Sequence, residues 1–315
     1  MQTLEASPVA HGTPSVGLRN RLETLLQRES VLGYLLLAPG LLLLIAFVAY
    51  PFGLAIYLSL TNKLIGVDAS GSFVGLTNFA RLLQNQVFRQ TVVNTFNYTF
   101  VAVVFKLALG MAMALALNEG LPLKNLVRGT MLLPWIVPST LSALAWLWMY
   151  DSNFGVLNWF LVTTGLVEKG PNWLGNEFWA MLSIQIVNVW RGVPFFGITL
   201  LAGLQTIPQD LYEAAQVDGA GPWHRFWNIT VPLLMPVTAV VTLFSTIQTF
   251  ADFEIVYVLT RGGPGNSTHL FATLTQQVAI QNGRLGEGAA ISLFMFPILV
   301  AVVLQQLRYL RKQGG

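Results

Sequence analysis

Six long apolar stretches constrain the fold of this chain more than any other feature of its sequence. Each is long enough to cross about 30 Å of hydrocarbon as a helix. Only 10% of the 315 residues are charged and 54% are hydrophobic, which is more apolar sequence than a globular core could bury. The sequence therefore predicts an all-α polytopic membrane protein with six transmembrane helices, near residues 31–60, 92–117, 128–150, 178–204, 234–258 and 288–307.

Prolines fall within several of these stretches. In the first, Pro39 and Pro51 predict a kink or an end at the membrane interface. In the others, neighbouring helices can bond the carbonyl groups that a proline frees; these prolines are Pro134, Pro138, Pro194 and Pro297. Helices interrupted in this way favour a bundle that moves or encloses a path over a simple membrane anchor.

The basic residues indicate an orientation. Six crossings place both termini on one side of the membrane, and that side carries a modest excess of Lys and Arg. It holds Arg19, Arg21, Arg28, Lys124, Arg128, Arg225, Arg308, Arg311 and Lys312, against Lys63, Arg81, Arg89, Lys169, Arg261 and Arg284 on the other. Basic residues favour the cytoplasmic face, so we expect the termini and the loop at 205–233 to be cytoplasmic.

Two short segments precede the first apolar stretch. Residues 1–17 are rich in small residues, Pro and Gly without periodicity, which predicts a disordered tail. Residues 18–29 place leucines on one face and charged residues elsewhere, which predicts a surface helix leading into the bilayer. They do not form a cleavable signal peptide, because the apolar run that follows is too long and lacks a cleavage pattern.

The loop at 205–233 is the one long segment with polar residues and ordered helix signals between two apolar regions. Pro208 marks the start of a helix and Gly219 its end, and between them Leu211, Ala214, Ala215 and Asp218 share one face. The two alanines leave room for another protein to approach closely. The pattern by itself fits either a docking element or an amphipathic hairpin on the membrane surface.

The spacing of this loop resembles the signature loop of ABC importer permeases. It reads Glu213-Ala214-Ala215, Gly219, Ile229, Val231 and Pro232, with valine at 231 where leucine is more usual. In that family the loop forms a coupling helix that sits in a cleft of a separate ATPase. The resemblance implies a polar contact for Glu213, close packing for the two alanines and a turn at Gly219. The same coupling loop contains Asp218 and Ala220.

Other segments resemble the carbohydrate class of these permeases, of the maltose and glycerol-3-phosphate type. They are Phe73–Phe79 in an outer loop, Trp190-Arg191 and Leu201–Leu204 before the signature loop, and Leu259–Ser267 in a second outer loop. The resemblance implies a type I importer fold, with a tail and surface helix at 1–30, a first helix and outer loop at 31–90, and a permease core at 91–310.

It further implies a multi-pass subunit in the inner membrane of a bacterial or archaeal cell. The expected partners are a second homologous permease, two ATP-binding subunits and an extracytoplasmic solute-binding protein. ATP and Mg would bind to the ATPase, and no cofactor to this chain. The mechanism implied is alternating access to a central cavity.

Charged residues within the predicted helices are candidates for a translocation path, because an unpartnered charge costs at least about 2.5 kcal/mol at the bilayer centre. Lys106 either lines the path or forms a buried pair with a carboxylate. Arg191 matches a basic position common in the family, and Asp252 and Glu254 are weaker candidates. Amides and an aromatic ring suited to a sugar lie in the same helices, where they could instead bond helix to helix: Asn94, Asn97, Gln185, Asn188, Trp190 and Gln248.

Other functional classes are less compatible with the sequence. It has no cysteine and no P-loop, and its three histidines are far apart, so we expect neither a catalytic nor a metal site. A net charge of +3 is too small to indicate nucleic acid. A secondary transporter or channel driven by an ion gradient and an intramembrane enzyme remain as alternatives. Transport by a secondary transporter would need an ion gradient, whereas transport by the importer would need an ATPase.

Overall fold

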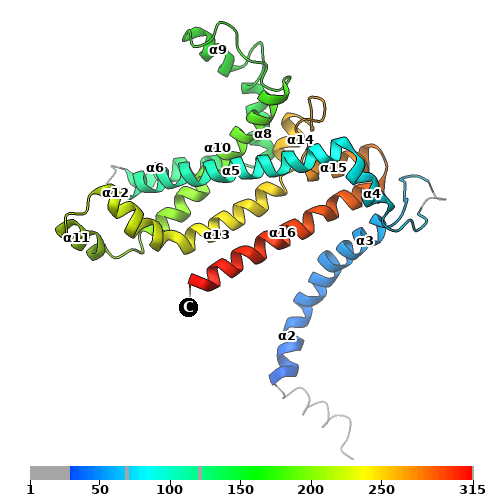
Figure 1. The fold of residues 1–315 in the computed structure, drawn as a ribbon, viewed down its shortest axis with the longest axis horizontal. Helices are drawn as coiled ribbons and strands as arrows, with labels where there is room; N and C mark the ends of the chain where they lie inside the picture. The colour runs from blue at the N-terminus through cyan, green and yellow to red at the C-terminus, as the bar shows by residue number, and fades with distance from the viewer. Residues whose placement is uncertain (1–28, 68–70, 120–122, 314–315) are drawn as a thin grey trace, which may run out of the picture. The chain divides into compact units, whose positions relative to one another are not determined.

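The computed structural model describes residues 29–67, 71–119 and 123–313, and these residues fold almost entirely into helices (Figure 1). The all-α prediction is confirmed. Five helices in the described residues are long and apolar enough to cross a membrane: Leu32–Ser59, Gln86–Asn118, Glu177–Leu204, Pro222–Leu259 and Leu285–Arg308. The predicted tail and nearly all of the predicted surface helix lie outside the described residues.

The chain divides into two units, the first of which ends at Leu54. It contains α2 (Glu29–Leu44), the π-helical turn η1 (Ile45–Ala49) and the first residues of α3 (Tyr50–Ser59). The wide turn ends two residues before Pro51, whose ring has no N–H and would crowd the carbonyl four residues earlier, within the turn. The predicted irregularity in this stretch is therefore a π turn within a continuous helix. Its side chains are mostly exposed and apolar, as expected of a lipid-facing helix.

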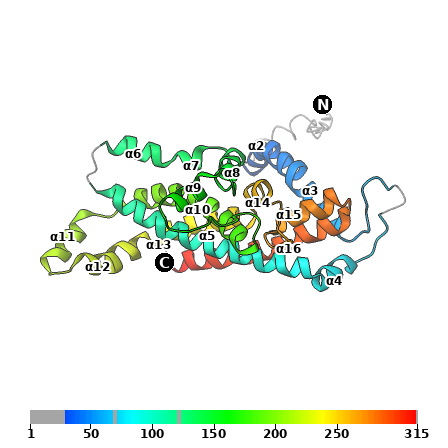
Figure 2. The ribbon, with the colours of Figure 1, turned by 90° about the horizontal axis from the view of Figure 1, so that it is seen from above.

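The second unit is built on four long helices: α5 (Gln86–Asn118), α10 (Glu177–Leu204), α13 (Val231–Phe250) and α16 (Leu285–Gln313). α5 and α10 lie side by side in Figures 1 and 2. Glycines permit this close approach, because a Cβ at Gly110 would collide with Phe196, and one at Gly197 would lie 2.6 Å from the sulfur of Met113.

The predicted third span at 128–150 is not one continuous helix. It consists of α6 (Lys124–Met131), α7 (Leu133–Ile136) and α8 (Ser139–Met149). Pro134 opens α7, and Pro138 holds Val137 in an extended conformation and caps α8. We expected neighbouring helices to tolerate both prolines within one span, and here they divide it. A short helix, α9 (Val156–Thr163), follows in the connection to α10.

The predicted fifth span at 234–258 lies within the long stretch Pro222–Leu259, which is itself interrupted. α13 ends at Phe250 and α14 (Glu254–Leu259) begins after a three-residue break. The Asp252 carboxylate lies in this break, and its Oδ1 accepts a hydrogen bond from the backbone N–H of Ile255, 3.4 Å away. The break therefore places a carboxylate beside the long helices.

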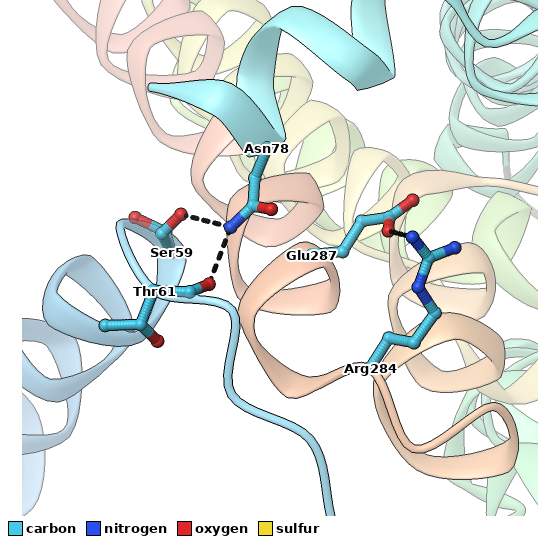
Figure 3. Close-up of polar contacts among 5 residues, drawn as sticks. All are labelled: Ser59, Thr61, Asn78, Arg284 and Glu287. Atoms are coloured by element: carbon cyan, nitrogen blue, oxygen red, sulfur yellow. Dashed lines mark hydrogen bonds and ion pairs between the residues drawn. The ribbon is translucent and has the colours of Figure 1, made fainter. Parts of the chain in front are cut away.

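Backbone and side-chain hydrogen bonds tie the segment after α3 to the rest of the second unit (Figure 3). Asn78 of α4 (Thr77–Gln84) donates from Nδ2 to the carbonyl oxygens of Ser59 and Thr61, both 2.8 Å away. These carbonyls lie at the end of α3 and just after it, where no helical donor remains for them. An ion pair between Arg284 and Glu287 stands at the start of α16, after α15 (Phe271–Gln276) and the π turn η3 (Gln277–Gln281).

Candidate functional site

The loop at 205–233 forms a hairpin of short helices at one end of the second unit (Figure 1). α11 (Gln209–Val217) begins after Pro208, and α12 (Pro222–Arg225) and the π turn η2 (Phe226–Thr230) lead into α13. The N–H of Ala220 bonds to the carbonyl of Ala215 at 2.8 Å, and that of Gly219 to Gln216 at 3.1 Å. This pair of bonds is the Schellman ending of a helix, and its left-handed residue is Gly219, with φ +81°.

Most of the predicted coupling residues in this hairpin are accessible. Glu213, Ala214, Asp218 and Gly219 are exposed, and Ala215 is half-buried. A hollow of about 580 Å³ lies beside the turn. The predicted residues that line it are Ala215, Asp218, Gly219, Ala220 and Ile229. Glu213, Ala214 and Pro232 do not line it. The arrangement can receive a protruding or complementary protein surface.

Side-chain contacts hold the hairpin in shape. The hydroxyls of Tyr212 and Thr230 lie 2.9 Å apart, so they join α11 to the end of η2. Trp223, Phe226 and Trp227 form an aromatic cluster, with ring centroids 5.1 to 6.2 Å apart. The first contact joins the two arms of the hairpin, and the second packs α12 against η2.

A second candidate site is a cavity of about 440 Å³ in the second unit. Its lining comes from α5, α7, α8, α10, α13, the break after α13 and the start of α14. Four predicted path residues line it, namely Lys106, Asn188, Arg191 and Gln248. The two weaker candidates, Asp252 and Glu254, line it as well, so the helices bring these six residues to one place.

Lys106 is 4% exposed, and its amine donates to the hydroxyls of Thr249 (2.8 Å) and Ser245 (3.3 Å) on α13. We expected either a path-lining lysine or a pair with a carboxylate. The structure places Lys106 in the cavity wall and directs its hydrogen bonds to hydroxyls. Its charge is then held by dipoles between α5 and α13.

Asp252 receives donors from two other helices. Its Oδ2 accepts from the Tyr98 hydroxyl of α5 at 2.6 Å and from Nδ2 of Asn188 on α10 at 2.8 Å. Because its Oδ1 also accepts from the N–H of Ile255 in α14, Asp252 connects three helices at one side of the cavity.

An aromatic wall completes the cavity, and the sequence analysis missed it. The Arg191 guanidinium carbon lies 5.4 Å from the ring centroid of Trp135, within the range of a cation–π interaction. Trp135 stacks on Phe195 at 4.7 Å, and Phe195 contacts Phe244 at 5.2 Å. The position of Trp135 between the two prolines that divide the third stretch was the available signal.

The remaining predicted path residues lie outside this cavity lining. Asn94 donates to the carbonyls of Ser267 (2.8 Å) and His269 (3.3 Å), and Gln185 donates to Asn97 at 2.8 Å. Trp190 contacts Trp146 edge to face at 5.5 Å, and Trp190 and Gln185 line a separate, apolar cavity of about 720 Å³. The contacts of the amides join helices or loops, and a substrate role for these residues stays a prediction.

The loop between α14 and α15, which receives Asn94, is closely packed. His269 is buried, with its Nδ1 3.2 Å from the Thr273 hydroxyl. Burial lowers the pKa of His269 to about 4, although a hydrogen bond that its ring donates to Gln277 opposes the shift. The described residues contain no group of three His, Asp or Glu side chains suited to hold a metal ion.

Comparison with known proteins decides the family. Residues 106–312 match the family described as binding-protein-dependent transport system inner membrane component. The match includes the cavity lining and the whole of the hairpin. This chain belongs to that family.

Curated relatives of this permease cover nearly its whole length. The trehalose/maltose transport system permease protein MalF of Thermococcus litoralis is 38% identical over 92% of this chain and 97% of that protein. The sulfoquinovosyl glycerol permease protein SmoG of Agrobacterium fabrum is 34% identical over 90% and 91%. The trehalose permease protein SugA of Mycobacterium tuberculosis (strain H37Rv) is 31% identical over 87% of both chains.

A solved structure confirms the fold. A chain of the bacterial ABC transporter that imports the acidic polysaccharide alginate superposes with a TM-score of 0.78 and 24% identity. The superposition covers 93% of the permease and 99% of that chain. The permease is thus a multi-pass inner-membrane protein with the importer permease fold, and a transport component rather than an enzyme. The intramembrane-enzyme alternative is excluded by this family membership.

Proposed function

We propose that this chain is the permease subunit of an ATP-driven importer for a carbohydrate, with the 440 Å³ cavity as part of its sugar path. Amide, hydroxyl and charged groups beside an aromatic wall are the combination that a hydroxyl-rich ligand with apolar ring faces needs. The relatives named for trehalose and maltose support a disaccharide as the first substrate to test.

The observation that carries this proposal is the connection between the two candidate sites. α10 bears Asn188 and Arg191, α13 bears Ser245 and Thr249, and the 205–233 loop joins the end of α10 to the start of α13. A displacement of α11 would therefore reach both helices that line the cavity. Glu213, Ala214, Ala215 and the turn at Gly219 would contact the ATPase.

The crossing number and orientation form part of the same proposal. α6, α7 and α8 together supply the sixth crossing, in addition to the five long helices. Both termini and the hairpin are then cytoplasmic, in agreement with the excess of basic residues on that side. The hairpin is then on the cytoplasmic side of the membrane, where an ATPase could bind it.

The proposed partners are a second homologous permease, two ATPase subunits and an extracytoplasmic solute-binding protein. ATP binding would close the ATPases, and the two permeases would rock as rigid bodies to move access to the cavity across the membrane. ATP and Mg²⁺ stay on the ATPases in this mechanism. The permease contributes the path and the mechanical link.

Purification tests the assembly. The chain is expressed with its neighbouring transport genes, extracted in mild detergent, and the copurifying proteins are counted. We expect one second permease and two ATPase copies per chain. A homogeneous preparation of this chain alone, active without an ATPase, would contradict the proposal and favour a secondary transporter.

A further inference from the structure

We propose that Asp252 is a positioning residue, which fixes the Asn188 side chain so that its amide oxygen accepts a hydrogen bond from a hydroxyl of the transported sugar. This inference rests on the proposed function, because it assigns one contact within the proposed path. It concerns a residue that acts through its neighbour rather than by touching the sugar.

The orientation of the Asn188 amide follows from the chemistry of its partner. The NH₂ of Asn188 lies 2.8 Å from Asp252 Oδ2 and donates to it, and the ionised form of Asp252 can only accept. The same oxygen also accepts from the Tyr98 hydroxyl at 2.6 Å. Two donors on two helices hold this carboxylate, and the Asn188 Oδ1 is forced to the opposite side of the amide.

Asn188 Oδ1 has no hydrogen-bond partner among the residues that the structure describes, although Asn188 is only 8% exposed and lines the cavity. A buried acceptor without a donor is unfavourable, and a ligand that supplies the donor removes this cost. A donor from a ligand in the cavity would satisfy this oxygen.

Arg191 supplies the complementary group. It follows Asn188 by three residues on α10, so the two side chains share a face. Its Nε is buried and likewise lacks a partner in the described part of the chain, and Arg191 lines the same cavity. One free acceptor and one free donor suit a hydroxyl, or two adjacent hydroxyls, because a hydroxyl both donates and accepts. A carboxylate or sulfonate would place an acceptor against the Asn188 oxygen.

The experiment uses the complete importer in liposomes, with both permeases, the ATPases and the binding protein. Uptake of trehalose and maltose is measured first, followed by uptake of the monodeoxy derivatives of whichever sugar is carried. For wild type we expect one derivative to lose about tenfold in kcat/KM relative to the parent sugar. In Asp252→Leu this ratio should fall towards one, because Asn188 is then free to turn. Asp252→Asn should keep part of it, since its amide oxygen can still accept from Asn188.

A matched control is Glu168→Gln, which removes an exposed carboxylate in the connection between α9 and α10 and should keep the wild-type ratio. The positioning role is overturned if Asp252→Leu takes up the parent sugar and loses the same tenfold for the same derivative. Thermal unfolding of Asn188→Ala, Asp252→Leu and the double variant tests the contact without any sugar. Additive changes there would overturn the contact, whereas a wild type that carries no sugar would contradict the proposed function instead.

Discussion

Lys106 crosses α10 at Gly192 on its way from α5 to α13. A Cβ at position 192 would lie 2.6 Å from Cδ of Lys106 and 2.7 Å from its Cε. Beyond this crossing the amine reaches the Thr249 hydroxyl at 2.8 Å. The missing side chain of Gly192 therefore allows a buried lysine to join two helices that line the cavity.

Gly192→Ala should displace the Lys106 side chain and break its hydrogen bonds. We expect the free energy of unfolding to fall by about 1–3 kcal/mol, the usual cost of overpacking, and the midpoint of thermal unfolding in detergent to fall with it. In a Lys106→Ala background the same substitution should cost much less. Gly129→Ala on α6 is the control, because nothing lies within 4 Å of its added Cβ. Equal costs for Gly192→Ala in both backgrounds would show that the two residues do not interact.

Sequence patterns predicted the helices that are regular and apolar over their whole length. α10, for example, runs from Glu177 to Leu204 where 178–204 was expected, and it keeps Pro194 inside. The same patterns could not divide 128–150 into three helices or place the break at Asp252. A proline can be accommodated or can end a helix, and tertiary packing decides which occurs.

The candidate sites were predictable to different degrees. The hairpin is local in sequence, so Pro208 and Gly219 were enough to indicate its helix and its turn. The cavity is formed by residues that lie far apart along the chain, such as Lys106, Arg191 and Gln248. Their polar character within apolar stretches made these residues candidates for the path. It could not distinguish them from Asn94 and Gln185, because an amide that lines a path and an amide that bonds two helices look alike in sequence.

Substitution of Asn78 tests the connection shown in Figure 3. Asn78→Ala leaves the carbonyls of Ser59 and Thr61 without their donor, and should lower the free energy of unfolding by about 1–3 kcal/mol. Asn78→Asp should cost more, since a carboxylate cannot donate and would face two carbonyl oxygens. Thr77→Ala removes the exposed hydroxyl beside it and should change the unfolding midpoint little. A fully stable Asn78→Asp would disprove the role of the amide.

Gly219 tests the proposed coupling. Its φ of +81° strains other residues, but a Cβ there meets nothing within 4 Å, so the substituted protein should still fold and enter the membrane. Gly219→Asp adds a charge beside Asp218 and should uncouple uptake from ATP hydrolysis. Gly219→Asn has the same shape without the charge and tolerates this conformation, so it should keep more uptake. Normal uptake by the aspartate variant would contradict the proposal that this turn contacts the ATPase.

His269, in the loop between α14 and α15, should make the stability of the folded protein depend on pH. Its pKa is about 4 in the folded protein and about 6.5 when unfolded, so below pH 6.5 the unfolded chain binds more protons. The contribution of His269 to stability is complete above pH 6.5 and declines as the pH falls towards 4. Between pH 7 and pH 5 the loss is about 2 kcal/mol.

Thermal unfolding of wild type and His269→Gln across this pH range measures that contribution. Glutamine keeps a polar side chain but does not titrate, so the variant should lose less stability on acidification even if it starts lower. Parallel pH dependences in the two proteins would show that His269 is not the group responsible.

The most direct test of the whole account is solute uptake by liposomes that contain the purified importer, with trehalose and maltose as the first solutes. We predict that uptake requires ATP on the ATPase side together with the binding protein, and that an ion gradient does not replace ATP. Uptake by this chain alone, driven by an ion gradient, would contradict the account.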